Sequence, residues 1–182
     1  MDEIVKAALK KWPNVPHCYG WLALDARGDW YMRDDRTQAA GPFPQVKGSR
    51  ILHDKLREFI QRNYASDEAG CWFFQNGPQR VYVELEAAPW VWRLSAGSSG
   101  VSNIESHTGL AASYRTASLD EHGRLFVATE LGLGIVHTLD MEAAADAIES
   151  GAWALEQVPF STLLSRHCIA LSPAAAAKPP GR

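Results

Sequence analysis

Residues 67–88 read DEAGCWFFQNGPQRVYVELEAA, and this stretch indicates the fold most clearly. It opens on an Asp-x-x-Gly turn, in which the aspartate accepts hydrogen bonds from the backbone that follows and the glycine adopts a positive φ. Two runs rich in aromatic and β-branched residues, 71–75 and 79–85, then flank an Asn-Gly-Pro turn at 76–78. This arrangement predicts a β-hairpin.

The Asp-x-x-Gly turn occurs three times in the chain, each time ahead of bulky residues. The copies begin at Asp25, Asp67 and Asp120. The second and third agree further, because each opens on Asp-Glu and each hairpin is followed by Glu-Ala-Ala, at 86–88 and at 142–144. One such turn is common in β-structure, but three copies in the same order predict a repeated hairpin unit. The repeat bears on the fold rather than on chemistry.

Amphipathic and capped stretches predict four helices around these hairpins. We expect them at 3–12, 49–64, 140–150 and 160–167. Further strands are expected at 18–24, 29–32, 90–94, 101–105, 113–119, 124–129, 134–138 and 153–157, with a loop over 33–48. The predicted class is α+β, with antiparallel sheets built from repeated β-hairpin units and packed helices.

The most linker-like stretch inside the chain is Gly97-Ser98-Ser99-Gly100. It predicts an N-terminal α+β half over 1–96 and a C-terminal α+β half over 101–172. The alanine- and proline-rich end, 173–182, has nothing to bury and is expected to be mobile.

Composition excludes several classes of protein. The chain has 182 residues, 46% of them hydrophobic, with a net charge of -3. That hydrophobic fraction is too high for a disordered chain, and the charge argues against a nucleic-acid binder. No apolar run is long enough to span a membrane, and the N-terminus does not resemble a secretory signal. The 3 cysteines are far apart, which suits a reducing compartment, so we expect a cytoplasmic protein.

Several stretches together resemble a family of uncharacterised bacterial proteins. They are Gly28-Asp29-Trp30, the helix at 51–59, the run at 67–74, and 81–90, which ends in Glu86-Ala87-Ala88-Pro89-Trp90. The resemblance is to proteobacterial proteins of unknown function that carry a V-E-D-A-P-F corner. This sequence departs from the family pattern at Ala87, where the family tends to have Asp, and in its long loop at 34–48. It implies repeated hairpin-and-helix units, no established activity and no catalytic residues to transfer.

Motifs for known chemistry are missing. No histidine or cysteine pair has metal-site spacing, and there is no G-x-S-x-G elbow. Gly132-Leu133-Gly134 lacks the third glycine of a dinucleotide-binding loop, so we predict no cofactor and no metal. Cys18 beside His17 is the better candidate for a nucleophile, because Cys71 lies in an apolar strand.

The chain contains 7 tryptophans, an unusually high number for its length. Trp90 and Trp92 are two residues apart in a predicted strand and therefore share a sheet face. With Arg80 or Arg93 nearby, the pair could form a stacking platform for a planar or sugar ligand. A tryptophan-rich core and a protein interface are the other two interpretations. His107, in the least regular part of the second half, completes the candidate ligand-binding residues.

The favoured function is a non-enzymatic, cytoplasmic binding or regulatory module for a small molecule or a protein. Signalling and a homo-oligomer joined through the aromatic face are left open, whereas nucleic acid and membrane are not expected as partners. The alternative is a small enzyme whose His/Cys or His/carboxylate groups are brought together by the fold. A concave pocket with two or more titratable groups would favour that alternative.

Overall fold

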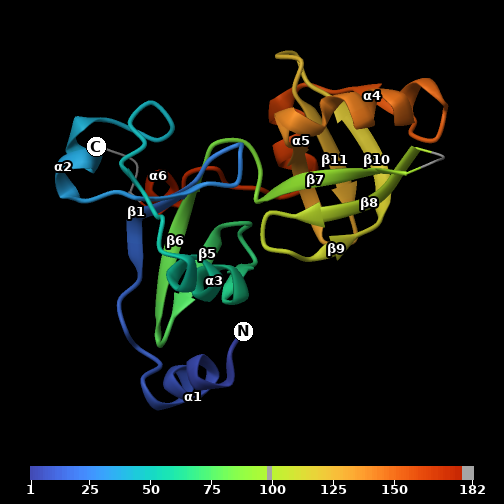
Figure 1. Cartoon of the computed structure of the whole chain (residues 1–182). Helices are drawn as coiled ribbons and strands as arrows, with labels where there is room; N and C mark the ends of the chain where they lie inside the picture. Colours follow the sequence, from blue (N-terminus) through green and yellow to red (C-terminus); the bar gives the residue numbers. More distant parts are fainter. Residues whose placement is uncertain (98–99, 178–182) are drawn as a thin grey trace. The chain divides into compact units, whose positions relative to one another are not determined.

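In the computed structural model, residues 1–97 and 100–177 are described, and they form two compact units (Figure 1). Unit 1 comprises Met1–Asp25, Asp29–Glu86 and the chain from Ile169. Unit 2 comprises Ala26–Gly28 and Ala87–Cys168. Each unit contains one sheet and packed helices, which confirms the α+β class.

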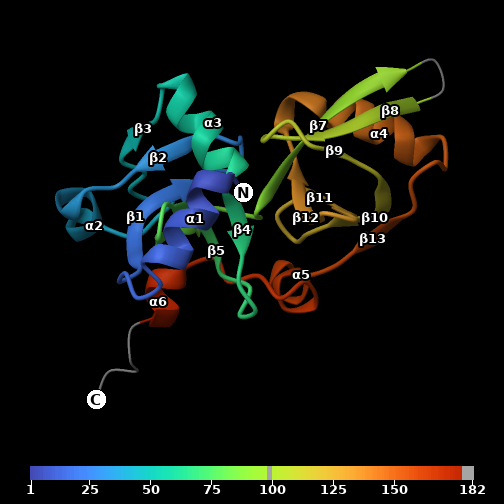
Figure 2. The ribbon, with the colours of Figure 1, turned by 90° about the horizontal axis from the view of Figure 1, so that it is seen from below.

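Unit 1 is a six-stranded sheet in the order β3-β2-β1-β6-β5-β4. Its elements are α1 (Glu3–Lys11), β1 (Cys18–Leu24), β2 (Trp30–Met32), α2 (Asp35–Ala40), β3 (Ser49–Arg50), α3 (Asp54–Arg62), β4 (Tyr64–Ser66), β5 (Trp72–Asn76), β6 (Gln79–Leu85) and α6 (Pro173–Ala177). Helix α6 lies against β6 and β1 (Figure 2). A core of apolar residues that includes Leu24, Trp30 and Val83 lies on one face of the sheet.

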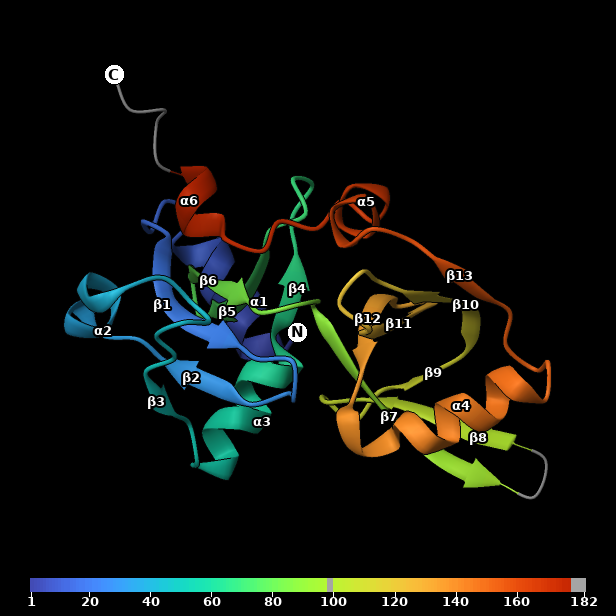
Figure 3. The same ribbon diagram turned by 90° about the horizontal axis from the view of Figure 1, so that it is seen from above.

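Unit 2 is a seven-stranded sheet in the order β13-β10-β11-β12-β7-β8-β9. Its elements are β7 (Trp90–Gly97), β8 (Gly100–Ser106), β9 (Ala111–Ala112), β10 (Tyr114–Leu119), β11 (Leu125–Thr129), β12 (Gly132–Val136), a 3-10 turn η1 (Thr138–Asp140), α4 (Met141–Glu149), β13 (Leu155–Gln157) and α5 (Phe160–Arg166). Helix α4 lies along β7 and β8 (Figure 3). Phe160 of α5 stacks on Phe126 of β11 with ring centroids 5.6 Å apart.

The two sheets share one strand topology. In unit 1, the meanders β1-β2-β3 and β4-β5-β6 are joined where the first strand, β1, pairs in parallel with the last, β6. In unit 2, the meanders β7-β8-β9 and β10-β11-β12 are joined in the same way, because β7 pairs in parallel with β12. The hairpins β4–β5 and β10–β11 therefore occupy equivalent places, and they carry the second and third copies of the sequence repeat.

The Asp-x-x-Gly turn has the predicted structure. Asp67 accepts hydrogen bonds from the amides of Ala69 and Cys71, and Asp120 accepts them from the amides of His122 and Arg124. The glycines of these two turns have φ of 75° and 73°.

A further turn of this kind begins at Ser106, which the sequence analysis did not identify. The Ser106 hydroxyl accepts from the amides of Thr108 and Leu110, and Gly109 has φ of 82°. Serine replaces aspartate here because its hydroxyl makes the same hydrogen bonds. What is repeated is therefore the hydrogen bonding of the turn, which serine supplies as well as aspartate.

Several predicted elements differ from those observed. The helix expected over 49–64 starts later, because Ser49 pairs in β3 and the His53 ring caps α3 by accepting from the Leu56 amide. The expected loop over 33–48 contains α2, whose N-cap is Asp34. The sheets are mixed rather than purely antiparallel.

At the expected linker, Gly97 pairs with Gly100 at the end of the β7–β8 hairpin, and residues 98–99 lie outside the described part. Of the expected mobile tail, residues 173–177 form α6, and 178–182 lie outside the described residues. Among the described helices, none has both the length and the apolar character needed to cross a membrane.

Candidate functional site

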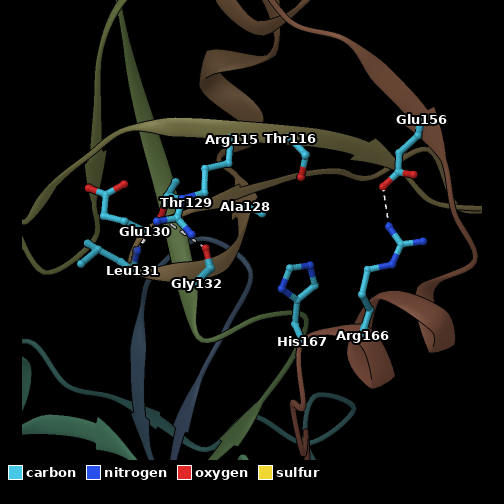
Figure 4. A pocket seen from close by; sticks show the side chains of 10 residues that line it. All are labelled: Arg115, Thr116, Ala128, Thr129, Glu130, Leu131, Gly132, Glu156, Arg166 and His167. Atoms are coloured by element: carbon cyan, nitrogen blue, oxygen red, sulfur yellow. Dashed lines mark hydrogen bonds and ion pairs between the residues drawn. The ribbon is translucent and has the colours of Figure 1, made fainter.

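A cavity of about 520 Å³ opens on the surface of unit 2 (Figure 4). Its walls come from β10, the β11–β12 turn, β13 and the last residues of α5. The lining residues are Arg115, Thr116, Ala128, Thr129, Glu130, Leu131, Gly132, Glu156, Arg166 and His167. A volume of this size is typical of small-molecule sites, and five of the ten residues are titratable.

A β-bulge places Arg115 in this wall. Tyr114 and Thr116 of β10 pair with consecutive residues of β11, Thr129 and Ala128, so that Arg115 is the extra residue. A bulge re-aims a side chain that regular alternation would send to the opposite face. Arg115 and Thr116 consequently both line the cavity, although they are neighbours in a strand. Among the described residues, Arg115 makes no side-chain hydrogen bond or ion pair.

The β11–β12 turn forms the rim and is anchored from three directions. The Thr129 hydroxyl accepts from the Leu131 amide and donates to the Gly132 carbonyl. The indole of Trp90 donates to the Leu131 carbonyl at 2.8 Å. The Glu130 carboxylate accepts from the Ser113 amide, and these backbone hydrogen bonds lower its pKa. The rim is therefore held in one conformation.

An ion pair forms the opposite wall. Arg166 donates from Nη1 to Glu156 Oε1 at 2.6 Å, and both side chains are about half exposed. The Ser118 hydroxyl donates to the same oxygen at 3.0 Å. Both contacts use Oε1, which leaves Oε2 of Glu156 as an acceptor and the other guanidinium nitrogens of Arg166 as donors.

His167 follows the last turn of α5, and its ring points into the cavity toward Thr116 and Ala128 (Figure 4). Burial lowers the pKa of His167, and the neighbouring Arg166 lowers it further. The imidazole is thus neutral at pH 7, with one nitrogen that donates and one that accepts. The next residue, Cys168, has a φ of 50°, which ends the helix in the left-handed region.

The cavity therefore combines groups suited to a charged or polar ligand. Arg115 offers a cation that makes no hydrogen bond among the described residues, and its charge helps to lower the pKa of Glu130, while Thr116 and His167 offer neutral donors and acceptors. In the described part of the chain, no group of three or more His, Cys, Asp or Glu side chains is placed to hold a metal ion.

The residues that the sequence singled out lie elsewhere. Trp90 and Trp92 are buried in unit 2, with exposed fractions of 6% and 0%, and their rings stack 6.0 Å apart. Trp92 donates to the Val127 carbonyl at 2.8 Å, as Trp90 does to Leu131. Their positions are those of core residues, although Trp90 supports the cavity rim from beneath.

His107 packs beside Trp90, with ring centroids 6.0 Å apart, and accepts from the Val91 amide at Nδ1. Burial lowers the pKa of His107 to about 3, so the ring is neutral. Arg93 points away to Asp140, to which it donates from Nε at 2.6 Å and from Nη2 at 3.3 Å. None of these residues lines the cavity.

Arg80 belongs to unit 1, where its guanidinium lies 4.4 Å from the centroid of the Phe73 ring. It also lines a second cavity, of about 480 Å³, with Ser66, Asp67, Glu68 and Ala69. The two candidate nucleophiles are in unit 1 as well, and burial raises the pKa of both Cys18 and Cys71. Their thiols are therefore protonated at neutral pH.

Sequence reasoning missed most of the cavity. Arg115, Glu156, Arg166 and His167 belong to no motif that the sequence makes recognisable. The one available signal for the site was Arg115, a lone arginine in the run Tyr114-Arg115-Thr116-Ala117-Ser118, whose other residues are small or hydroxylated. Its direction depends on the bulge, which no residue type in this run specifies.

Comparison with known proteins identifies a family. A family model described as "Protein of unknown function (DUF2946)" matches residues 1–179. This match confirms the expected resemblance to an uncharacterised family. No curated protein matches the chain.

Two crystal structures of DUF1285 family proteins are similar to the chain. The protein from Silicibacter pomeroyi DSS-3 aligns with a TM-score of 0.51 and 12% identity, over 80% of this chain and 84% of that one. The protein from Shewanella baltica OS155 aligns with a TM-score of 0.46 and 14% identity, over 71% and 94%. At these identities the first alignment bears on the fold alone.

Proposed function

The chain belongs to the family described as "Protein of unknown function (DUF2946)", and we infer a function from the cavity itself. We propose that unit 2 is a binding module for a small molecule with an anionic group, such as a carboxylate or a phosphate. The single observation that carries the proposal is Arg115, a bulge-directed cation in a cavity wall with no carboxylate bonded to it in the described residues.

The neighbouring groups favour an anion at this position. Thr116 and the neutral His167 each supply a donor in the same lining as Arg115. Arginine presents several N–H groups in a planar fork that fits two oxygens of one carboxylate or phosphate. Charge-assisted hydrogen bonds of this kind contribute about 1.5–3 kcal/mol each.

Binding is favoured over catalysis by what surrounds the histidine. A general base is usually oriented by a hydrogen bond to a carboxylate or a carbonyl. Glu156 is the carboxylate nearest in the lining, and its described contacts go to Arg166 and Ser118 rather than to His167. The enzyme alternative would need a ligand-induced change in this wall.

The proposal is tested by titrating the whole chain with acetate and with inorganic phosphate, monitored by NMR chemical shifts at constant ionic strength. Shifts should localise to the amides of the β11–β12 turn and of His167. Arg115→Gln should weaken binding on the order of 10- to 100-fold, as the loss of one charge-assisted contact predicts. Arg36→Gln, at an exposed arginine of α2 in unit 1, is the matched control. Equal affinities for the two variants would refute the proposal.

A further inference from the structure

We propose that the ligand of this cavity is a zwitterion, with its anionic group at Arg115 and a protonated amine at Glu156. This inference rests on the proposed function and specifies the chemical class of the ligand. It follows from three properties of the wall: its charge balance, the acceptor that remains on Glu156, and the placement of the two charged ends along one strand.

The lining is neutral as a whole. Two arginines, Arg115 and Arg166, are balanced by two glutamates, Glu130 and Glu156, and His167 adds no charge near pH 7. A net-neutral ligand with separated charges complements such a wall. A dianion would bring one of its charges against a glutamate, and like charges at short distance repel.

Glu156 retains the capacity to accept from an amine. Its described contacts, from Arg166 at 2.6 Å and from Ser118 at 3.0 Å, both end on Oε1. A carboxylate has about four lone-pair positions on its two oxygens. Figure 4 shows Oε2 on the side of the carboxylate away from His167, and an ammonium group that reaches it gains a charge-assisted hydrogen bond without displacing Arg166.

Strand pairing separates the two ends of the site. Glu156 of β13 pairs with Ser118 of β10, and Arg115 lies three residues earlier on the same strand. At about 3.3 Å per residue this gives at most roughly 10 Å along β10 between Arg115 and Ser118, because the bulge at Arg115 shortens the strand. Figure 4 shows the Arg115 side chain extending toward the β11–β12 turn and the Glu156 carboxylate beside Arg166 at the other end of the cavity, so the ligand's charged groups are separated by several bonds rather than adjacent.

An ω-amino-acid series tests the inference directly. Isothermal titration of the full chain would compare glycine, 3-aminopropanoate, 4-aminobutanoate and 6-aminohexanoate with butanoate, butylamine and succinate. We expect at least one zwitterion to bind about ten times more tightly than butanoate, which corresponds to about 1.4 kcal/mol. Succinate should bind more weakly than that zwitterion.

Variants separate this inference from the proposed function. In Glu156→Gln, the ratio of the zwitterion's affinity to that of butanoate should fall to about one, while butanoate should still bind. Arg166→Gln keeps the Glu156 carboxylate and removes the cation that competes for it, so this affinity ratio should increase. Butanoate binding equal to that of every zwitterion, or an advantage that survives Glu156→Gln, would overturn the zwitterion and leave the anion site standing. If none of the acids binds, the proposed function fails as well.

Discussion

Gly134 lies directly against the indole of Trp92: a Cβ atom at Gly134 would stand 2.3 Å from Trp92 Nε1 and 2.7 Å from the Cβ of Trp90. The glycine therefore provides the space in β12 that lets both indoles pack across the strand. Gly134, the second glycine of the Gly132-Leu133-Gly134 pattern, thus has a packing role.

Gly134→Ala should destabilise unit 2 by about 1–3 kcal/mol, because an added methyl group in a well-packed core forces its neighbours to shift. Urea denaturation measures the loss. In a Trp92→Phe background the smaller ring relieves part of the clash, so the cost of Gly134→Ala should fall. Strictly additive costs in the double variant would show that the two residues do not compete for space.

Trp90→Phe should loosen the rim of the cavity. The variant removes the indole N–H that donates to the part-buried Leu131 carbonyl, and the loss of such a hydrogen bond costs about 0.5–1.5 kcal/mol. Amide hydrogen exchange in the β11–β12 turn should accelerate, and acetate should bind more weakly. Leu155→Ala, at an exposed position of β13, is a control that should leave exchange in this turn unchanged.

Asp120→Ala should cost about 1–3 kcal/mol at pH 7, since its carboxylate accepts from two amides and from Arg124 Nε at 2.7 Å. Burial raises the pKa of Asp120, but these hydrogen bonds outweigh it and leave the pKa below the usual 3.8. The ionised form is therefore favoured in the folded state. Its contribution is complete above about pH 4 and is lost as the pH falls through the folded pKa. Urea midpoints of wild type and variant should differ at pH 7 and converge toward pH 2.

The sequence predicted the turns and strands of this fold better than it predicted the site. Asp-x-x-Gly turns depend on local side-chain-to-backbone hydrogen bonds, so Asp67 and Asp120 could be assigned from neighbouring residues alone. The start of α3 was wrong because β3 pairs with β2, a contact between segments far apart in sequence. The cavity depends on such contacts throughout: Arg115 is directed by a bulge, and His167 reaches β10 from the end of α5.

Anion affinity should rise as the pH falls below 6.5. The pKa of His167 is lowered by burial and by Arg166, so the ring gains a proton only in mildly acidic solution. A bound anion favours the protonated ring, and each proton taken up strengthens binding. Acetate and phosphate titrations between pH 5 and 8 measure this. Because phosphate titrates in the middle of this range and acetate only toward its lower end, acetate above about pH 5.5 is the decisive ligand, and His167→Gln should remove the pH dependence. An unchanged profile in that variant would assign the proton to another group.

Cys168→Gly should stabilise the chain by about 0.5–1 kcal/mol. A non-glycine residue with φ near 50° carries a conformational cost that glycine avoids, although glycine also gains entropy in the unfolded state. Cys168→Ala keeps the Cβ atom and should give no such gain, which makes it the matched control. Equal urea midpoints for the two variants would indicate that this helix end is unstrained.

The parallel pairing of first and last strands has a consequence for how the chain is made. In neither sheet can the two meanders join until the last strand of the second meander has left the ribosome, because β1 pairs with β6 and β7 pairs with β12. Unit 1 is completed later still, because residues 170 and 171 also form hydrogen bonds within it. The Leu171 carbonyl accepts from the Leu85 amide at 2.8 Å, and the Ala170 amide donates to the Gly70 carbonyl at 3.1 Å. The half of the protein that is synthesised first is therefore the half that is completed last.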